Sequence, residues 1–340
     1  MTTSYQVTLS PGGQKFSTEG NESLLQAALN AGFSLPYGCR TGACGACKAK
    51  VTDGLVDHGN AQDGALSIAD RSVRMALLCC AKPLSDLVLE CREVSATKDI
   101  PIKILPCRVQ KMERAADDVI VLSLKLPTNE HLQFLPGQYI EFLLKGGKRR
   151  AFSIANASHQ NDFIELHIRR VPDGEFTAHV FDVMKEKDIL RFQGPYGSFY
   201  LRDDSTKPII FLAGGTGFAP IKSVIEDALH KKTIRSMALY WGARNQPGLY
   251  RNELAEQWTQ RHPNLSYHPV LSDLSAGELW SGRTGLVHQA VVHDHPDLSA
   301  FQVYACGSPA MIDAARDAFF ARGLPEHEFF ADAFTFSLLT

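Results

Sequence analysis

Three patterns of hydrophobic and polar positions follow one another along the chain. Residues 5–10 alternate between apolar and polar side chains, as a half-buried strand does, and residues 22–33 place apolar residues on one face of a predicted helix. Gly32 is suited to end that helix. Residues 86–93 (DLVLECRE) predict a further strand, and the polar stretch after it stops at Pro101. We therefore expect a small mixed domain in residues 1–95 and a linker in 96–103.

The middle of the chain has only strand patterns. Short apolar runs are separated by glycine and proline throughout residues 104–203. Such spacing predicts a small antiparallel β-barrel. The predicted strands occupy residues 117–127, 138–146, 163–171 and 188–197.

Strands and helices alternate in residues 204–340, which predicts a parallel sheet covered by helices. The predicted strands are residues 207–213, 236–243, 265–272 and 301–309. The predicted helices are residues 219–232, 250–262 and 310–323. The whole chain is thus expected to combine α+β and α/β domains.

Composition narrows the choice of partners. The chain has 340 residues, of which 21% are charged, and its formal net charge is −2 without a long basic run. Nucleic acid and anionic membranes are therefore unsuitable partners. The first residues lack a basic stretch followed by an apolar one, and the longest apolar run, residues 208–221, is short and rich in glycine. We expect no secretory signal, no membrane span and a cytoplasmic location.

Three of the eight cysteines lie in the stretch YGCRTGACGACKAK. Cys39, Cys44 and Cys47 have the C-x4-C-x2-C spacing of a plant-type 2Fe–2S cluster, which takes a fourth cysteine from elsewhere in the chain. Glycines at 38, 42 and 45 would let the backbone bend around the cluster and bring amides to its sulfurs. This spacing predicts an iron–sulfur centre.

The fourth ligand is Cys79 or Cys80, and Pro83, four residues after Cys79, favours Cys79. A structural zinc site and a thioredoxin-like Cys-x-x-Cys pair are the alternatives. A zinc ribbon usually has two Cys-x-x-Cys knuckles and this stretch has one. Cys80, Cys91 and Cys107 are interpreted as buried small apolar residues.

Residues 149–156, RRAFSIAN, contain groups that suit a flavin. Arg150 can bind a phosphate, Phe152 can lie against the ring, and Ser153 can hydrogen-bond its reactive nitrogen. Gly174 and Thr177, about twenty residues later, precede a helix-like segment whose first amides suit a pyrophosphate. The alternatives are a core phenylalanine between surface residues and an ordinary turn with a threonine cap.

A glycine turn between a predicted strand and helix suits a nucleotide. Gly214, Gly215 and Gly217 would let amides approach phosphates, and Thr216 adds a hydroxyl. Cys306 ends a later strand, at the edge of a parallel sheet where ligands bind. Each signal is weak by itself, because glycine turns and buried cysteines are common without a ligand.

Together these motifs resemble the ferredoxin–NADP reductase family, in the branch that carries a ferredoxin domain. The segments CRTGACGAC, RAFS, GEFT, GGTGFAP and ACGSP occur in the family's order and cover nearly the whole chain. The resemblance implies a β-grasp ferredoxin domain, a β-barrel with FAD and an α/β domain for NAD(P)H. Electrons would pass from the nicotinamide through the flavin to the cluster, because a flavin accepts two electrons and can pass them on singly.

The resemblance also assigns roles to residues. Arg150, Phe152 and Ser153 would contact the flavin, and Gly174 and Thr177 its pyrophosphate. Thr216 and Cys306 would lie beside the nicotinamide, with Ser153 and Cys306 as the catalytic pair. Phe334 would cover or border the flavin, and a core phenylalanine is the rival interpretation.

The coenzyme can be predicted from the end of one strand. Family members that use NADP place a serine and an arginine after the third strand of the nucleotide domain, and this chain has Ser272 and Asp273 there. A carboxylate repels the 2′-phosphate and can accept from a ribose hydroxyl. We expect NADH rather than NADPH, with Arg244 as a possible counterweight.

The electron acceptor is a separate question. Segments such as LPGQYIEFLL and FFADAF resemble reductases that serve pyridoxamine-phosphate-dependent sugar dehydratases of 3,6-dideoxyhexose synthesis. Related reductases serve oxygenase components, either ring-hydroxylating dioxygenases or diiron monooxygenases. A non-catalytic iron–sulfur redox sensor is the alternative of another class, and the flavin and nicotinamide motifs argue against it.

Overall fold

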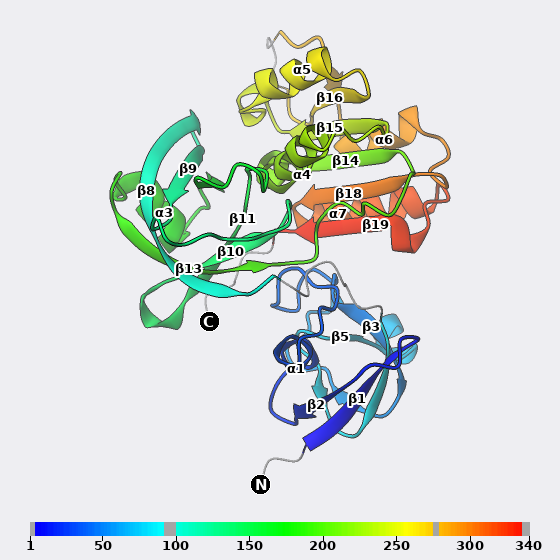
Figure 1. The fold of residues 1–340 in the computed structure, drawn as a ribbon. Helices are drawn as coiled ribbons and strands as arrows, with labels where there is room; N and C mark the ends of the chain where they lie inside the picture. Colours follow the sequence, from blue (N-terminus) through cyan, green and yellow to red (C-terminus); the bar gives the residue numbers. More distant parts are fainter. Residues whose placement is uncertain (1–3, 92–99, 275–278, 335–340) are drawn as a thin grey trace. The chain divides into compact units, whose positions relative to one another are not determined.

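The chain forms two compact units in a computed structural model that describes residues 4–91, 100–274 and 279–334 (Figure 1). The first unit is Met1–Pro101 with Asp332–Thr340, and the second is Ile102–Ala331. The predicted linker falls largely on residues 92–99, outside the described residues. Among the helices that the structure describes, none is long and apolar enough to cross a membrane.

The N-terminal unit has the expected β-grasp arrangement. Its five-stranded sheet has the order β2-β1-β7-β3-β5, in which β1 is antiparallel to β2 and parallel to β7. Helix α1 packs on β2, and the Ser23 side chain accepts from the Gln26 amide to cap it. The sheet strands are β1 (Ser4–Ser10), β2 (Lys15–Glu19), β3 (Lys48–Asp53), β5 (Met75–Leu77) and β7 (Leu87–Glu90). Smaller elements are α1 (Leu24–Asn30), β4 (Val56–Asp57), α2 (Ile68–Ser72) and β6 (Lys82–Pro83).

The second unit begins with the predicted antiparallel barrel. Its strand order is β11-β10-β13-β8-β9-β12, and an antiparallel bridge between Ile154 and Leu166 joins the two edges. Leucine, isoleucine, valine and phenylalanine side chains from these strands fill the interior. The strands are β8 (Lys103–Ala116), β9 (Val119–Lys125), β10 (Tyr139–Leu143), β11 (Arg149–Ser153), β12 (Ile164–Arg169) and β13 (Ile189–Tyr196), and α3 (Glu175–Asp182) covers one end.

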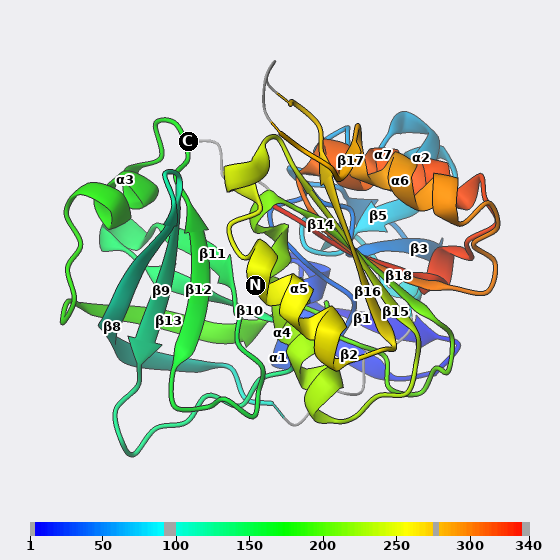
Figure 2. The same ribbon diagram turned by 90° about the horizontal axis from the view of Figure 1, so that it is seen from above.

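The rest of the second unit is the predicted parallel sheet. Its order is β17-β16-β15-β14-β18-β19, with α4 and α5 on one face and α6 and α7 on the other (Figure 2). The strands are β14 (Ile209–Gly214), β15 (Met237–Ala243), β16 (Leu265–Leu271), β17 (Arg283–Thr284), β18 (Gln302–Gly307) and β19 (Phe329–Ala333). The helices are α4 (Phe218–His230), α5 (Asn252–Arg261), α6 (Val287–Asp294) and α7 (Pro309–Phe320). In open sheets of this kind, ligands bind at the carboxyl ends of the strands, which here are the ends of β14 and its neighbours.

A buried polar chain joins the barrel to this sheet within the second unit. The His167 ring, on β12, is fully buried and lies 2.9 Å from Glu165 and 2.8 Å from the Tyr250 hydroxyl. Burial lowers the pKa of His167, although the Glu165 carboxylate opposes the shift. Histidine is therefore held neutral in the folded protein, and its protonation should destabilise the unit.

We predict a pH dependence from this histidine. Because its pKa is lower in the folded than in the unfolded state, its stabilising contribution is complete above about pH 6.5, the ordinary histidine pKa. That contribution is lost as the pH falls, by up to about 1.4 kcal/mol per pH unit. His167→Gln should remove this part of the slope between about pH 6.5 and pH 5.

Urea unfolding at several pH values, followed by tryptophan fluorescence, would measure the effect. All three tryptophans, Trp241, Trp258 and Trp280, belong to the second unit, so the signal reports that unit. The exposed His131 provides the control substitution, His131→Gln. An identical slope in the wild type and in His167→Gln would show that this histidine is not responsible.

Candidate cofactor sites

The cysteine loop brings four sulfurs together in two pairs. The Cys39 and Cys44 side chains are hydrogen-bonded to each other, and so are those of Cys47 and Cys79. A 2Fe–2S cluster takes two thiolates on each of its two irons, so two neighbouring pairs match its donor set. The residues present therefore fit the cluster that the sequence predicts.

Backbone amides of the loop point at the sulfurs. The Cys39 amide donates to Cys44 Sγ and the Thr41 amide to Cys39 Sγ, each at 3.4 Å. Gly42 adopts a φ of +78°, and a Cβ atom there would lie 2.6 Å from Cys80 Sγ. This φ and this close contact require a glycine, and the Gly42 amide is also hydrogen-bonded to the Cys79 sulfur.

Each sulfur pair contains one acidic thiol. The hydrogen bond from Cys44 lowers the pKa of Cys39 to about 5, and the hydrogen bond from Cys47 lowers that of Cys79 to about 3. The pKa values of the donating thiols, Cys44 and Cys47, are raised by these bonds and by burial. The loop thus favours the thiolate, the form that binds iron, at Cys39 and Cys79, while Cys44 and Cys47 act as the hydrogen-bond donors.

Cys80 lies behind the loop. It is buried, and its sulfur is 3.6 Å from Cys79 Sγ, while Cys79 also reaches Cys47. Cys107 is buried as expected, and burial raises its pKa to about 12. Cys91 is only half-buried, which differs from the prediction, because it lies just beyond the last residue of β7.

The predicted flavin residues lie on β11 and α3. Ser153 is buried at the end of β11, and the half-buried Phe152 has its ring 5.6 Å from that of Phe176 in α3. Arg150 is half-buried and donates to the Arg149 carbonyl at 2.8 Å. The two flavin motifs are therefore neighbours, although about twenty residues separate them in the sequence.

The start of α3 differs in one respect from the prediction. Thr177 lies inside the helix rather than before it, and its hydroxyl accepts from the Val171 amide and donates to the Gly174 carbonyl, both at 3.1 Å. Gly174 is the N-cap residue and has no side chain to occupy the first-turn amides. The first-turn amides, and not the Thr177 hydroxyl, are therefore the groups that can donate hydrogen bonds to a pyrophosphate.

The glycine turn connects β14 directly to α4. Gly214 ends the strand, and Gly215, Thr216 and Gly217 form a single 3₁₀ turn before the helix. A Cβ atom on Gly217 would lie 2.1 Å from the Cys306 carbonyl oxygen. The turn is thus packed directly against the end of β18, where Cys306 is fully buried beside Ala213.

The predicted coenzyme-selecting residues also meet at this edge. Asp273 follows β16 and its amide donates to the Arg244 carbonyl, which follows β15, at 2.8 Å. Both side chains are exposed. The carboxylate and the guanidinium would act in opposite directions on a 2′-phosphate.

Phe334 directly follows β19 and is half-buried. The residues after it, 335–340, lie outside the described residues. Its proximity to the flavin stays a prediction.

Two residues at the glycine turn were not found from the sequence. The Trp241 indole donates to the Gly215 carbonyl at 2.9 Å and stacks on Phe218, with ring centroids 3.8 Å apart. Arg169 ends β12 and lies against Gly215. A Cβ atom added to Gly215 would be 2.7 Å from the Arg169 Nη1. Only the run of two arginines in HIRRV could have indicated a cation here.

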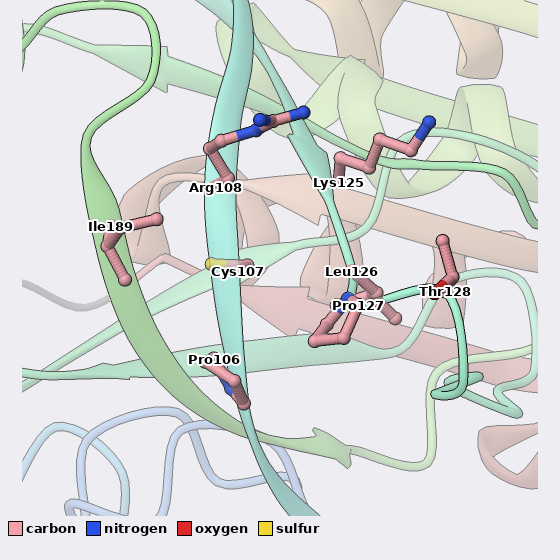
Figure 3. A pocket seen from close by; sticks show the side chains of 8 residues that line it. All are labelled: Pro106, Cys107, Arg108, Lys125, Leu126, Pro127, Thr128 and Ile189. Carbon is pink, nitrogen blue, oxygen red and sulfur yellow. The ribbon is translucent and has the colours of Figure 1, made fainter.

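A hollow of about 270 Å³ lies on the barrel, over β8 and β9 (Figure 3). None of the predicted flavin residues lines it. Its lining residues are Pro106, Cys107, Arg108, Lys125, Leu126, Pro127, Thr128 and Ile189. The hollow is therefore separate from the predicted flavin site.

Known protein families match the three regions in the same order. Residues 7–84 match the 2Fe-2S iron-sulfur cluster binding domain, residues 106–200 the oxidoreductase FAD-binding domain, and residues 211–317 the oxidoreductase NAD-binding domain. The chain is 43% identical over 331 residues to the CDP-6-deoxy-L-threo-D-glycero-4-hexulose-3-dehydrase reductase of Yersinia pseudotuberculosis, covering 97% of this chain and 98% of that protein. The chain belongs to the ferredoxin–NADP reductase family. It is an NAD(P)H-dependent iron–sulfur flavoprotein reductase, which passes electrons to a separate acceptor.

Other relatives of this reductase serve oxygenases. The reductase component DmpP of phenol 2-monooxygenase from Pseudomonas sp. is 38% identical, covering 97% of this chain and 94% of that protein. The crystal structure of the Amycolatopsis cytochrome P450 reductase GcoB has a TM-score of 0.78 and 33% identity, covering 97% of this chain and 98% of that one. All three domains of the reductase therefore have counterparts in one solved chain.

We predict that Cys79, and not Cys80, binds the cluster. Cys79→Ala should abolish the part of the visible absorbance that belongs to the cluster, and the iron content, because one of the four thiolates is lost. Cys80→Ala should retain both, because its sulfur packs behind Gly42. Iron and labile sulfide per chain, with an electron paramagnetic resonance spectrum of the reduced protein, would measure this. The opposite pattern would move the ligand to Cys80.

Proposed function

We propose that this reductase uses NADH to supply electrons to a pyridoxamine-phosphate-dependent sugar dehydratase, as a CDP-6-deoxy-3,4-glucoseen reductase does. The observation that carries the proposal is the 43% identity to the Yersinia reductase, which extends over nearly the full length of both chains. The absence of a long basic run supports a protein acceptor in the cytoplasm rather than a nucleic acid or a membrane.

A reductase component of an oxygenase is the second candidate. The phenol 2-monooxygenase reductase is 38% identical, and a terephthalate 1,2-dioxygenase reductase component from Comamonas sp. is 36% identical. These values are close to that of the Yersinia protein, so the fold and electron path would be the same and only the acceptor would change.

The flavin would lie along β11 and the start of α3. When bound, it supplies the conversion of a two-electron donor into single-electron steps. Phe152 would face its ring, Ser153 would hydrogen-bond its reactive nitrogen, and Arg150 with the first-turn amides at Gly174 would bind its phosphates. Thr177 would act by closing the turn that presents those amides. Phe334 would border the ring.

The nicotinamide coenzyme would lie on the glycine turn. The amides of Gly214, Gly215 and Gly217 and the Thr216 hydroxyl would approach its phosphates, and Arg169 would add positive charge. The buried Cys306, packed against Gly217, would fix the position of the nicotinamide.

Asp273 supports NADH as the coenzyme, because its carboxylate repels a 2′-phosphate. The ratio of kcat/KM for NADH to that for NADPH should exceed one, and Asp273→Ser should lower it. A lower KM for NADPH than for NADH in the wild type would contradict this choice.

Ser153→Ala tests the flavin geometry. Loss of a hydrogen bond that acts in the transition state should slow flavin reduction by NADH by roughly ten- to a thousandfold, with little change in NADH affinity. Stopped-flow absorbance at saturating NADH would measure the rate. Ser299→Ala, at an exposed serine between α6 and β18, is the control. Unchanged reduction kinetics would remove this role from Ser153.

The acceptor can be identified by capture and reconstitution. The cluster-replete reductase would be tagged and used to capture partners from its host's lysate, and each candidate would be tested for NADH-dependent turnover. Turnover of a pyridoxamine-phosphate-dependent sugar dehydratase would support the proposal. Reduction of an oxygenase component instead would move the assignment to the second candidate. Purified protein without flavin or NADH oxidation would favour the redox sensor.

A further inference from the structure

Helix α4 touches both halves of the second unit. Its N-cap residue is Gly217, the last residue of the glycine turn. Five residues later, Lys222 and Ser223 are buried against the barrel, with exposed fractions of 6% and 0%. A lysine is almost never buried to this extent unless its charge is compensated.

The positive charge of the Lys222 amine is compensated by one carboxylate of the barrel and one of α4. Its Nζ lies 3.1 Å from Glu165 on β12 and 2.9 Å from Glu226 on α4 itself. It also donates to the Ala155 carbonyl at 3.2 Å. The amine therefore makes three contacts, two of them with the barrel.

Ser223 adds a second contact to the same barrel segment. Its hydroxyl donates to the Asn156 carbonyl at 2.7 Å. The Asn156 side chain is itself held, because its amide donates to the Phe163 carbonyl at 3.0 Å and its oxygen accepts from the Glu165 amide at 2.8 Å. Helix α4 thus binds two consecutive carbonyls of a segment that has little freedom to move.

These contacts form a short path between the two predicted reaction partners. Ser153 is two residues before Ala155, which spans roughly 7 Å of extended chain. Gly217 is five residues before Lys222, which spans about 7.5 Å of helix. The path runs along helix α4, through the buried hydrogen bond to Ala155 and along the two residues after β11, whose amides donate to the Gln138 and Glu165 carbonyls.

Stability alone does not explain the buried charges. Replacing a buried ion pair with well-packed apolar residues is often neutral or stabilising, whereas the geometry of such a group can specify one arrangement. A displacement of about 1 Å between reacting groups can cost a hundredfold in rate. We call the contacts of Lys222 and Ser223 with the barrel the clamp. Its buried charges can be explained by the relative position of the barrel and α4 that they fix.

We propose that Lys222, assisted by Ser223, is a positioning residue that fixes the spacing between the flavin strand β11 and the nicotinamide-binding glycine turn. This inference rests on the proposed places of the flavin at Ser153 and of NADH at Gly217. Lys222 touches neither cofactor in this scheme. It acts through the Ala155 carbonyl and through α4.

The clamp can first be tested in flavin-free protein. Lys222→Met keeps the length of the side chain and removes its charge. Hydrogen exchange of the backbone amides of Ala155 and Glu165 should become at least tenfold faster than in the wild type, while strand β9 should be unchanged. Lys232→Met, at an exposed lysine just beyond the same helix, should leave all these amides unchanged. Unchanged exchange at both amides would overturn the clamp.

The second test uses protein loaded with FAD and NADH. Lys222→Met should lower the rate of flavin reduction at saturating NADH by ten- to a hundredfold, with bound FAD unchanged and the NADH dissociation constant within threefold. The long-wavelength charge-transfer absorbance between the nicotinamide and the flavin should weaken in parallel. Lys222→Arg, which retains the charge, should recover part of the rate.

Ser223→Ala keeps the proposal testable if Lys222→Met does not fold. It should slow flavin reduction by three- to tenfold at unchanged NADH affinity. Normal reduction rates in variants that only lose thermal stability would overturn the positioning role. A wild-type protein whose flavin is not reduced by NADH would overturn the proposed function instead, and the exchange measurement would still decide whether Lys222 holds the barrel segment.

Discussion

The second unit depends on the burial of a lysine amine where the barrel meets the parallel sheet. Lys222 lies there between Glu165 and Glu226, and the pKa of Glu165 is lowered to about 2 because the hydrogen bond from His167 and the Lys222 charge outweigh burial. Glu165 in turn holds His167, and His167 reaches Tyr250 beside the Trp241 ring. Polar contacts and aromatic stacking therefore connect strand β12 and the segment after β11 to the glycine turn. Because these side chains are buried, water cannot replace a lost hydrogen-bond partner. A substitution of one of them therefore affects the others.

The iron–sulfur loop depends on local geometry instead. Three of its four sulfurs lie within nine residues, and its amides reach the sulfurs because glycines allow the bend. Only the fourth sulfur comes from a distant strand end. This difference explains why the cluster could be predicted from spacing, whereas the junction between barrel and sheet could not.

Motifs that are contiguous in the sequence were predicted well. The β-grasp, barrel and parallel-sheet arrangements follow from the patterns and the resemblance, and the helix predicted over residues 310–323 is α7, which begins one residue earlier at Pro309. Strand β8 was missed because Pro106 and the charged residues after Val109 obscure its alternation. Lys222 looked like an ordinary helix lysine, since nothing in APIKSVI reveals that Glu165, 57 residues earlier, would face it. Thr177 was placed before its helix because threonine is a common N-cap residue, whereas the N-cap here is Gly174.

The division of the chain into two units has a consequence for evolution. The residues assigned to the flavin and the nicotinamide belong to the second unit, apart from Phe334, whereas all four sulfurs belong to the first. A different ferredoxin module fused to the same NAD(P)H-oxidising module would therefore leave its coenzyme preference unchanged. Relatives named for sugar and for aromatic chemistry, at 43% and 38% identity, match nearly the whole chain, so both keep these modules in the same order.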